Sequence, residues 1–190
     1  MNIFRLQKYD PSKYDDLGQY TLDEWTCVSE IGKIFGGELF SRAEYICVED
    51  SYIAVISDLL KICEIDQLKV LADHIWPRDV EEYEQYLFDI PIQEALNFPE
   101  GEWIGGDKLL TFCRLCLRNL QGFSVTNEKD FFIAFTGDFY VHIGFAVNVD
   151  DLFSKARESG LYIVKLGEIG DKELDNEFYL ELLPKFSFGN

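Results

Sequence analysis

The stretch "GFSVTNEKDFFIAFTGDFYVHIGFAV", residues 122–147, decides the fold that this sequence predicts. Three runs rich in aromatic and β-branched residues, "GFSVT", "DFFIAF" and "FYVHIGFAV", are joined by the short polar stretches "NEK" and "TGD". Such a pattern is typical of antiparallel strands connected by tight turns, so we expect a meander. One face of its last strand should carry alternating apolar residues: Phe139, Val141, Ile143, Phe145 and Val147.

The segment after the meander predicts a helix and a further strand. "NVDDLFSKARESG", residues 148–160, has the pattern of an amphipathic helix closed by Gly160, and "LYIVKL", residues 161–166, is typical of a strand. A strand, a helix and a strand in this order most simply form a right-handed crossover that adds a parallel strand. The acidic segment 167–188 is compatible with an edge strand or with a short helix.

Two helix starts are indicated before the meander, because two segments have the spacing of a capping box flanked by a hydrophobic staple. The box residues and their aromatic neighbours are Thr21 and Glu24 with Tyr20 and Trp25, and Ser41 and Glu44 with Phe40 and Tyr45. We expect a helix to begin at each box. The second helix should be long and central, since apolar residues recur on two of its sides as far as Cys63.

Two further helices are expected between the second box and the meander. Proline bounds the first of them, which lies after Pro77 and before Pro91, and the second spans residues 107–120 and is closed by Gly122. The sequence therefore predicts an α/β (α+β) fold in a single domain over residues 1–190. N-terminal helices would pack on a mixed, mostly antiparallel sheet from the C-terminal half.

The composition favours a globular protein of a reducing compartment. The 190 residues are 47% apolar and 15% aromatic, which is enough for a large core. The five cysteines are scattered and odd in number, which indicates free thiols rather than disulfides. Neither a signal peptide nor an apolar segment of about 18 residues is present, so we expect a cytoplasmic chain with no membrane span.

The net charge of −18 bounds the partners of the chain. A field of this sign repels phosphate backbones and anionic lipid, and it attracts basic surfaces over a Debye length of about 8–10 Å. We therefore expect no direct binding of nucleic acid or membrane, and we expect a basic partner.

Few residues have the spacing that catalysis or metal binding requires. His74 and His142 have no partner motif, so packed side chains are expected. Cys113 and Cys116 match half of a zinc site, but no second pair follows, and on a helix they share a face with core leucines. "DKELDNE", residues 171–177, lacks the central Gly of a calcium loop, and the glycines match no nucleotide-binding fingerprint. We expect no catalytic residues, metal or cofactor.

An acidic run, residues 79–107, contains nine carboxylates and no Lys or Arg, which amounts to half of the net charge. A solvated face that serves solubility is one interpretation. Aromatic residues interleave with the acids, however, and this combination favours a binding surface that imitates the charge of a phosphate backbone. The residues expected to contact a partner are Asp79, Glu81, Glu82, Tyr83, Glu84, Tyr86, Asp89, Glu100, Glu102 and Trp103.

The early segment "YDDLGQYTLDEWTCVSEIGKIFGGELFSRAEYICVEDSYIAV", residues 14–55, is similar to the opening of some immunity proteins. As a small acidic domain without catalytic motifs, the chain resembles the immunity proteins of bacterial contact-dependent growth inhibition and related polymorphic toxin systems. The resemblance implies that it binds a cognate toxin C-terminal domain, a basic protein that is often a nuclease, and blocks its active site. It carries over no individual functional residue.

Two other functions stay open at the level of sequence. A carboxylate-based or metal-dependent hydrolase would bring two or more of the 35 acids together in one cleft. A scaffold protein would use its exposed aromatics to contact other subunits. We expect a binding protein rather than an enzyme, and a monomer or weak homodimer. The sequence leaves open whether the acidic helix or a sheet edge makes the contact.

Overall fold

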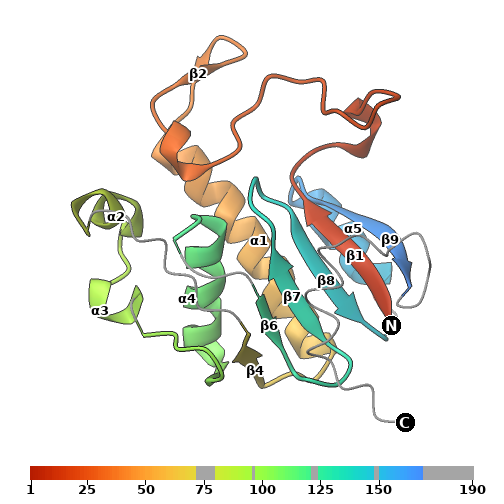
Figure 1. The fold of residues 1–190 in the computed structure, drawn as a ribbon. Helices are drawn as coiled ribbons and strands as arrows, with labels where there is room; N and C mark the ends of the chain where they lie inside the picture. Colours follow the sequence, from red (N-terminus) through yellow and green to blue (C-terminus); the bar gives the residue numbers. More distant parts are fainter. Residues whose placement is uncertain (72–79, 96, 121–123, 148–149, 169–190) are drawn as a thin grey trace.

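The computed structural model describes residues 1–71, 80–95, 97–120, 124–147 and 150–168. Within them a seven-stranded sheet in the order β5-β4-β6-β7-β8-β1-β9 packs against the helices α1, α4 and α5 (Figure 1). The strands of this sheet are β1 (Asn2–Gln7), β4 (Gln67–Val70), β5 (Trp103–Gly105), β6 (Ser124–Thr126), β7 (Phe132–Phe135), β8 (Val141–Phe145) and β9 (Tyr162–Glu168). The helices are α1 (Arg42–Ile62), α2 (Val80–Leu87), α3 (Ile92–Ala95), α4 (Gly106–Leu117) and α5 (Asp150–Glu158).

The predicted meander is confirmed as β6, β7 and β8, each antiparallel to the next. Its register aligns Val125 with Ile133 and Ile133 with Ile143, so these three residues share one buried face. The predicted alternation fails at Val147, which is 41% exposed, because β8 ends at Phe145. Phe139 is buried as expected, although it precedes the strand.

The crossover from β8 through α5 to β9 does bring β9 parallel to β8, but the two strands are not neighbours. β1 lies between them and pairs antiparallel with both. Its alternating residues Phe4 and Leu6 belong to the same core face as β8. Because β1 lies between β8 and β9, every neighbouring pair in the sheet is antiparallel. The sequence pattern of the C-terminal half could not indicate this feature.

One of the two predicted helix starts is confirmed and the other is wrong. The hydroxyl of Ser41 accepts the backbone N–H of Glu44 at 3.1 Å and begins α1. No α-helix begins at Thr21. Its hydroxyl instead donates a hydrogen bond to the carbonyl of Lys13 at 2.7 Å. The carboxylate of Glu24 accepts hydrogen bonds from Lys8 and Tyr20, so these contacts replace the predicted capping box.

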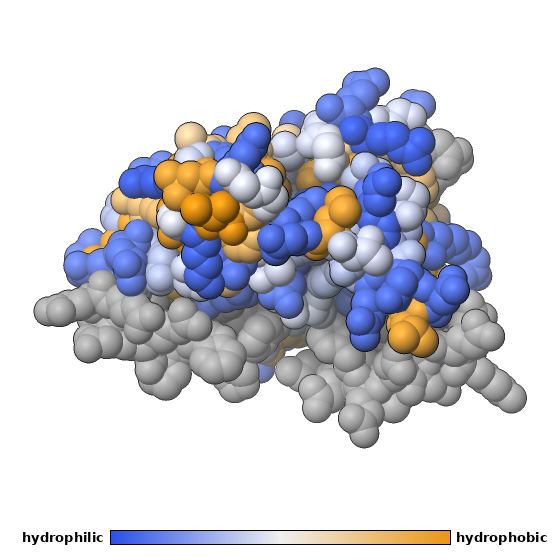
Figure 2. All heavy atoms as spheres, turned by 90° about the horizontal axis from the view of Figure 1, so that it is seen from above, coloured by the Kyte–Doolittle hydropathy of each residue, from blue (hydrophilic) through white to orange (hydrophobic). Residues whose placement is uncertain are grey.

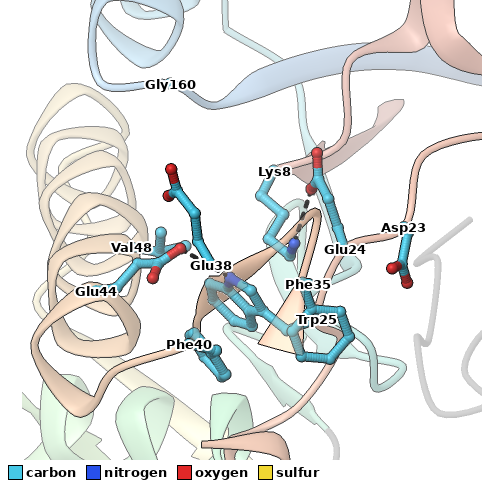
Figure 3. A pocket seen from close by; sticks show the side chains of 10 residues that line it. All are labelled: Lys8, Asp23, Glu24, Trp25, Phe35, Glu38, Phe40, Glu44, Val48 and Gly160. Atoms are coloured by element: carbon cyan, nitrogen blue, oxygen red, sulfur yellow. Dashed lines mark hydrogen bonds and ion pairs between the residues drawn. The ribbon is translucent and has the colours of Figure 1, made fainter. Parts of the chain in front are cut away.

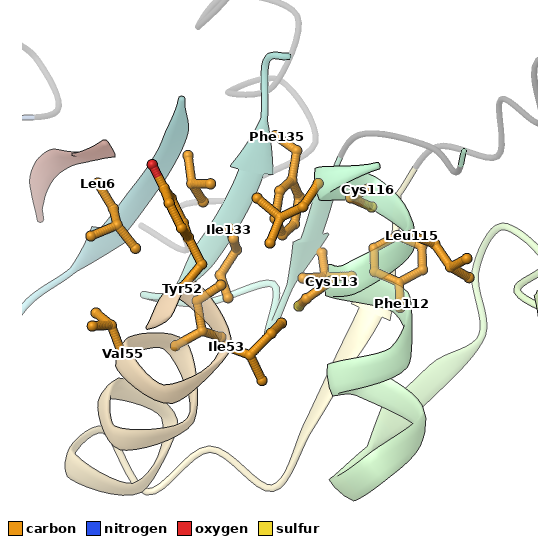
Figure 4. Packing of buried hydrophobic residues seen from close by; sticks show 14 of the residues in the cluster. Leu6, Tyr52, Ile53, Val55, Phe112, Cys113, Leu115, Cys116, Ile133 and Phe135 are labelled. Atoms are coloured by element: carbon orange, nitrogen blue, oxygen red, sulfur yellow. The ribbon is translucent and has the colours of Figure 1, made fainter. Parts of the chain in front are cut away.

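The core lies between α1, α4 and the sheet (Figure 4). α1 contributes Tyr52, Ile53 and Val55 to it. Cys113 and Cys116 of α4 are buried hydrophobes, as expected, and all five cysteines are free. The helix predicted between Pro77 and Pro91 is confirmed as α2, and the helix predicted over residues 107–120 is confirmed as α4. No helix among the described residues has the length and apolar character needed to cross a membrane.

A small hairpin projects from the body at the start of α1 (Figure 1). It consists of β2 (Ile34–Phe35) and β3 (Glu38–Leu39). Seen from this end, the surface is largely hydrophilic with separate hydrophobic patches (Figure 2). Two short 3-10 turns, Pro11–Lys13 and Val28–Glu30, lie in the irregular segment between β1 and the hairpin.

Candidate functional site

The structure divides the predicted acidic run into two groups of residues. The first group belongs to α2 and the residues after it. Glu81, Glu82 and Tyr83 lie within this helix, and Asp79 lies outside the described residues. Glu84 and Asp89 are exposed, whereas Tyr86 is half-buried.

A buried arginine holds the first group in place. The guanidinium of Arg118, at the end of α4, donates to the backbone carbonyls of Leu87 at 2.6 Å and Tyr86 at 3.3 Å. It also donates to both carboxylate oxygens of Glu49 in α1, with Nη2 at 2.7 Å and Nε at 2.8 Å. Burial raises the pKa of Glu49, while the hydrogen bonds from Arg118 oppose this shift. Phe88 lies against the guanidinium, with its ring centre 4.6 Å away.

The second group lies at the opposite end of α4. Glu100 is exposed, and Trp103 of the edge strand β5 is 45% exposed. The carboxylate of Glu102 forms an ion pair with the ammonium group of Lys108, in the first turn of α4, with 2.7 Å between Oε1 and Nζ. α4 has 12 residues and therefore spans about 18 Å at 1.5 Å per residue. The acidic run thus presents two patches rather than one, and whether either binds a partner stays a prediction.

The fold also brings basic side chains into contact with the run. Lys108 follows it directly and pairs with Glu102. Arg118 and Arg42 both contact the ring of Phe88, with Arg42 4.1 Å from its centre. Among the described carboxylates of the run, the exposed ones are those of Glu84, Asp89, Glu94, Glu100 and Asp107.

A second acidic feature, which no sequence pattern indicates, is a hollow of about 340 Å³ beneath the small hairpin (Figure 3). We call it the hairpin hollow. It is lined by Lys8, Asp23, Glu24, Trp25, Phe35, Glu38, Phe40, Glu44, Val48 and Gly160. These residues come from the end of β1, the irregular segment, the hairpin, α1 and the end of α5 (Figure 3).

Lys8 lies deep in the hairpin hollow, with a side chain only 7% exposed. Its ammonium group donates to Glu24 at 3.0 Å and lies 4.2 Å from the ring centre of Trp25. Burial lowers the pKa of Lys8, and the hydrogen bond that Lys8 donates to Glu24 opposes that shift. The other face of Trp25 stacks on Phe40 at 4.2 Å between ring centres. Lys8 and Glu24 are 16 positions apart, so no local spacing reveals the pair.

Of the two histidines and the segment tested for calcium binding, only His142 lies among the described residues. His142 lies on β8, partly buried, where burial and nearby Arg5 lower its pKa to about 4. His74 and the segment 171–177 lie outside the described residues. Within the described residues no three His, Cys, Asp or Glu side chains gather into a set that could hold a metal ion.

Comparison with protein-family models, with curated proteins and with solved structures found no match to the chain.

Proposed function

We propose that this chain is an immunity protein that binds and neutralises a cognate toxin domain, a basic nuclease, in the cytoplasm. The observation that carries the proposal is the net charge of −18 combined with exposed carboxylates beside an exposed tryptophan. A nuclease must present Lys and Arg to its substrate, and this surface offers those side chains carboxylate acceptors.

The mechanism is occlusion of the toxin's substrate groove. Glu84 and Asp89 at one end of α4, and Glu100 at the other, would pair with the lysines and arginines that hold the phosphate backbone. The spacing of about 18 Å along α4 suits contacts with two separate points of a groove. Trp103 supplies an aromatic contact of the kind that dominates binding energy in protein interfaces.

The first experiment uses the toxin that the proposal predicts, the C-terminal domain of a large secreted protein that should be encoded directly upstream of this chain. Co-expression of the chain should restore growth to cells that produce this domain, and the two purified proteins should bind. Absence of both rescue and binding would contradict the proposed function.

The second experiment tests the location of the contact with the same toxin domain. Replacing Glu81, Glu82 and Glu84 by Gln removes three charges from α2. The matched control replaces Glu64, Asp151 and Glu158, three exposed acids outside α2, by their amides. We expect a loss of affinity of about tenfold or more for the first variant and a much smaller loss for the control. Equal affinities would show that α2 does not bind the toxin.

A further inference from the structure

The small hairpin exposes an apolar pair to solvent. Ile34 and Leu39 face each other across the strands, and they are 67% and 64% exposed. The turn between them contains Gly36 and Gly37, both with positive φ, as hairpin turns that match the strand twist require. Large apolar side chains on a projecting element are typical of a contact surface rather than of a solvated one.

The opposite side of the same hairpin forms a wall of the hairpin hollow. Because side chains alternate along a strand, Phe35 and Glu38 point away from the apolar pair. Phe35 lies 6.1 Å from Phe40, measured between ring centres, and both line the hollow together with Glu38. The apolar pair and the hollow thus lie on opposite sides of the hairpin.

The charge in the hollow is not balanced. Four carboxylates and one ammonium group line it, a formal charge of −3. The ammonium group of Lys8 pairs with Glu24, and the carboxylate of Glu44 accepts a hydrogen bond from the indole N–H of Trp25 at 3.3 Å. Asp23 and Glu38 form no ion pair with any residue that the structure describes. A cavity with aromatic walls and an excess of carboxylates is suited to a cationic side chain.

We infer that the hairpin and its hollow form a second docking surface, in which the hollow receives a Lys or Arg side chain of the partner. Ile34 and Leu39, on the outer side of the hairpin, would contact a separate apolar part of the same partner. The inference rests on the proposed function for the existence of a basic protein partner. Charge selects this occupant, since a second copy of a chain with net charge −18 would repel the hollow, as would anionic lipid.

A small-molecule titration tests the hollow without the toxin. N-acetyl-L-arginine methylamide is added to the labelled protein while the indole N–H signal of Trp25 is followed by NMR. The matched probe is the citrulline analogue, which has the same shape without the charge. We expect a saturable shift with the arginine compound alone. This shift should disappear when Asp23, Glu38 and Glu44 are replaced by their amides, a change that keeps an acceptor for Trp25.

The toxin domain then tests the whole surface. The triple amide variant should bind it at least tenfold more weakly, and Ile34→Ser with Leu39→Ser should accelerate dissociation by a similar factor. The triple amide control at Glu64, Asp151 and Glu158 should change neither value more than about twofold. Thermal unfolding of each variant reports whether the fold is retained.

The two proposals fail in different ways. If the toxin binds normally to both hairpin variants, the docking surface is refuted and the proposed function stands. If no toxin binds the wild-type chain, the proposed function is refuted. An arginine compound that shifts the Trp25 signal no more than citrulline does would overturn the assignment of the hollow in either case.

Discussion

Arg118 shows how one side chain joins three elements of this protein. Its guanidinium is buried at the end of α4 and pairs with Glu49 of α1. Its Nη1 group donates hydrogen bonds to the carbonyls at the end of α2. A buried pair of this kind contributes little relative to apolar residues, but either partner alone is costly because its charge stays buried. The position of the acidic helix therefore depends on a contact in the core.

Arg118→Met should lower the free energy of unfolding by about 3–5 kcal/mol, because it removes the nearer partner of the buried Glu49 carboxylate and leaves the more distant Arg114 at 3.5 Å. Urea unfolding measures this loss. The double variant with Glu49→Leu should be more stable than the sum of the single losses implies. Lys61→Met serves as the control, since Lys61 is exposed and pairs at 3.4 Å with Asp58, away from Glu49. Strictly additive losses would show that the pair is not coupled.

His142 makes stability depend on pH at the residue scale. Its pKa falls from 6.5 to about 4 on folding, mainly through burial, so the unfolded chain binds a proton more readily than the folded one. Stability should therefore rise with pH between about 4 and 6.5 and lose this contribution as pH falls through that window. His142→Gln should reduce the slope of unfolding free energy against pH there. Parallel curves for the two proteins would contradict this assignment.

At the scale of elements, the same local pattern has two outcomes. Ser41 and Glu44 form a working helix cap, whereas Thr21 and Glu24, with identical spacing, do not. The difference lies in distant partners: Lys8 and Tyr20 bind Glu24, and Trp25 is buried against Phe40. Sequence spacing could predict α1 because its apolar pattern continues for 21 residues, but no such pattern follows Thr21.

Ser41→Ala should destabilise the protein by about 1 kcal/mol, because the backbone N–H of Glu44 loses its acceptor at the start of α1. Thermal or urea unfolding gives the value. Ser154→Ala, at an exposed position of α5, is the matched control and should change stability by less than about 0.5 kcal/mol. Equal effects at both positions would mean that the cap contributes nothing specific.

At the scale of the whole molecule, the meander and the helices that flank it could be predicted because each is encoded by local periodicity. The place of β1 could not be predicted, since it depends on pairing with strands more than 130 positions later in the chain. The acidic run is visible in sequence, yet its division by α4 and its contacts with Lys108 and Arg118 arise only in the fold. The hairpin hollow likewise combines residues from five segments.

The central claim is that the negative charge of the molecule attracts and binds a cation-rich surface of a partner protein. Stopped-flow association of the chain with the toxin domain, measured from about 0.05 to 0.5 M salt, tests it most directly. The association rate constant should fall at least tenfold over this range, while the dissociation rate constant changes far less. An association rate constant that does not depend on salt would contradict the claim.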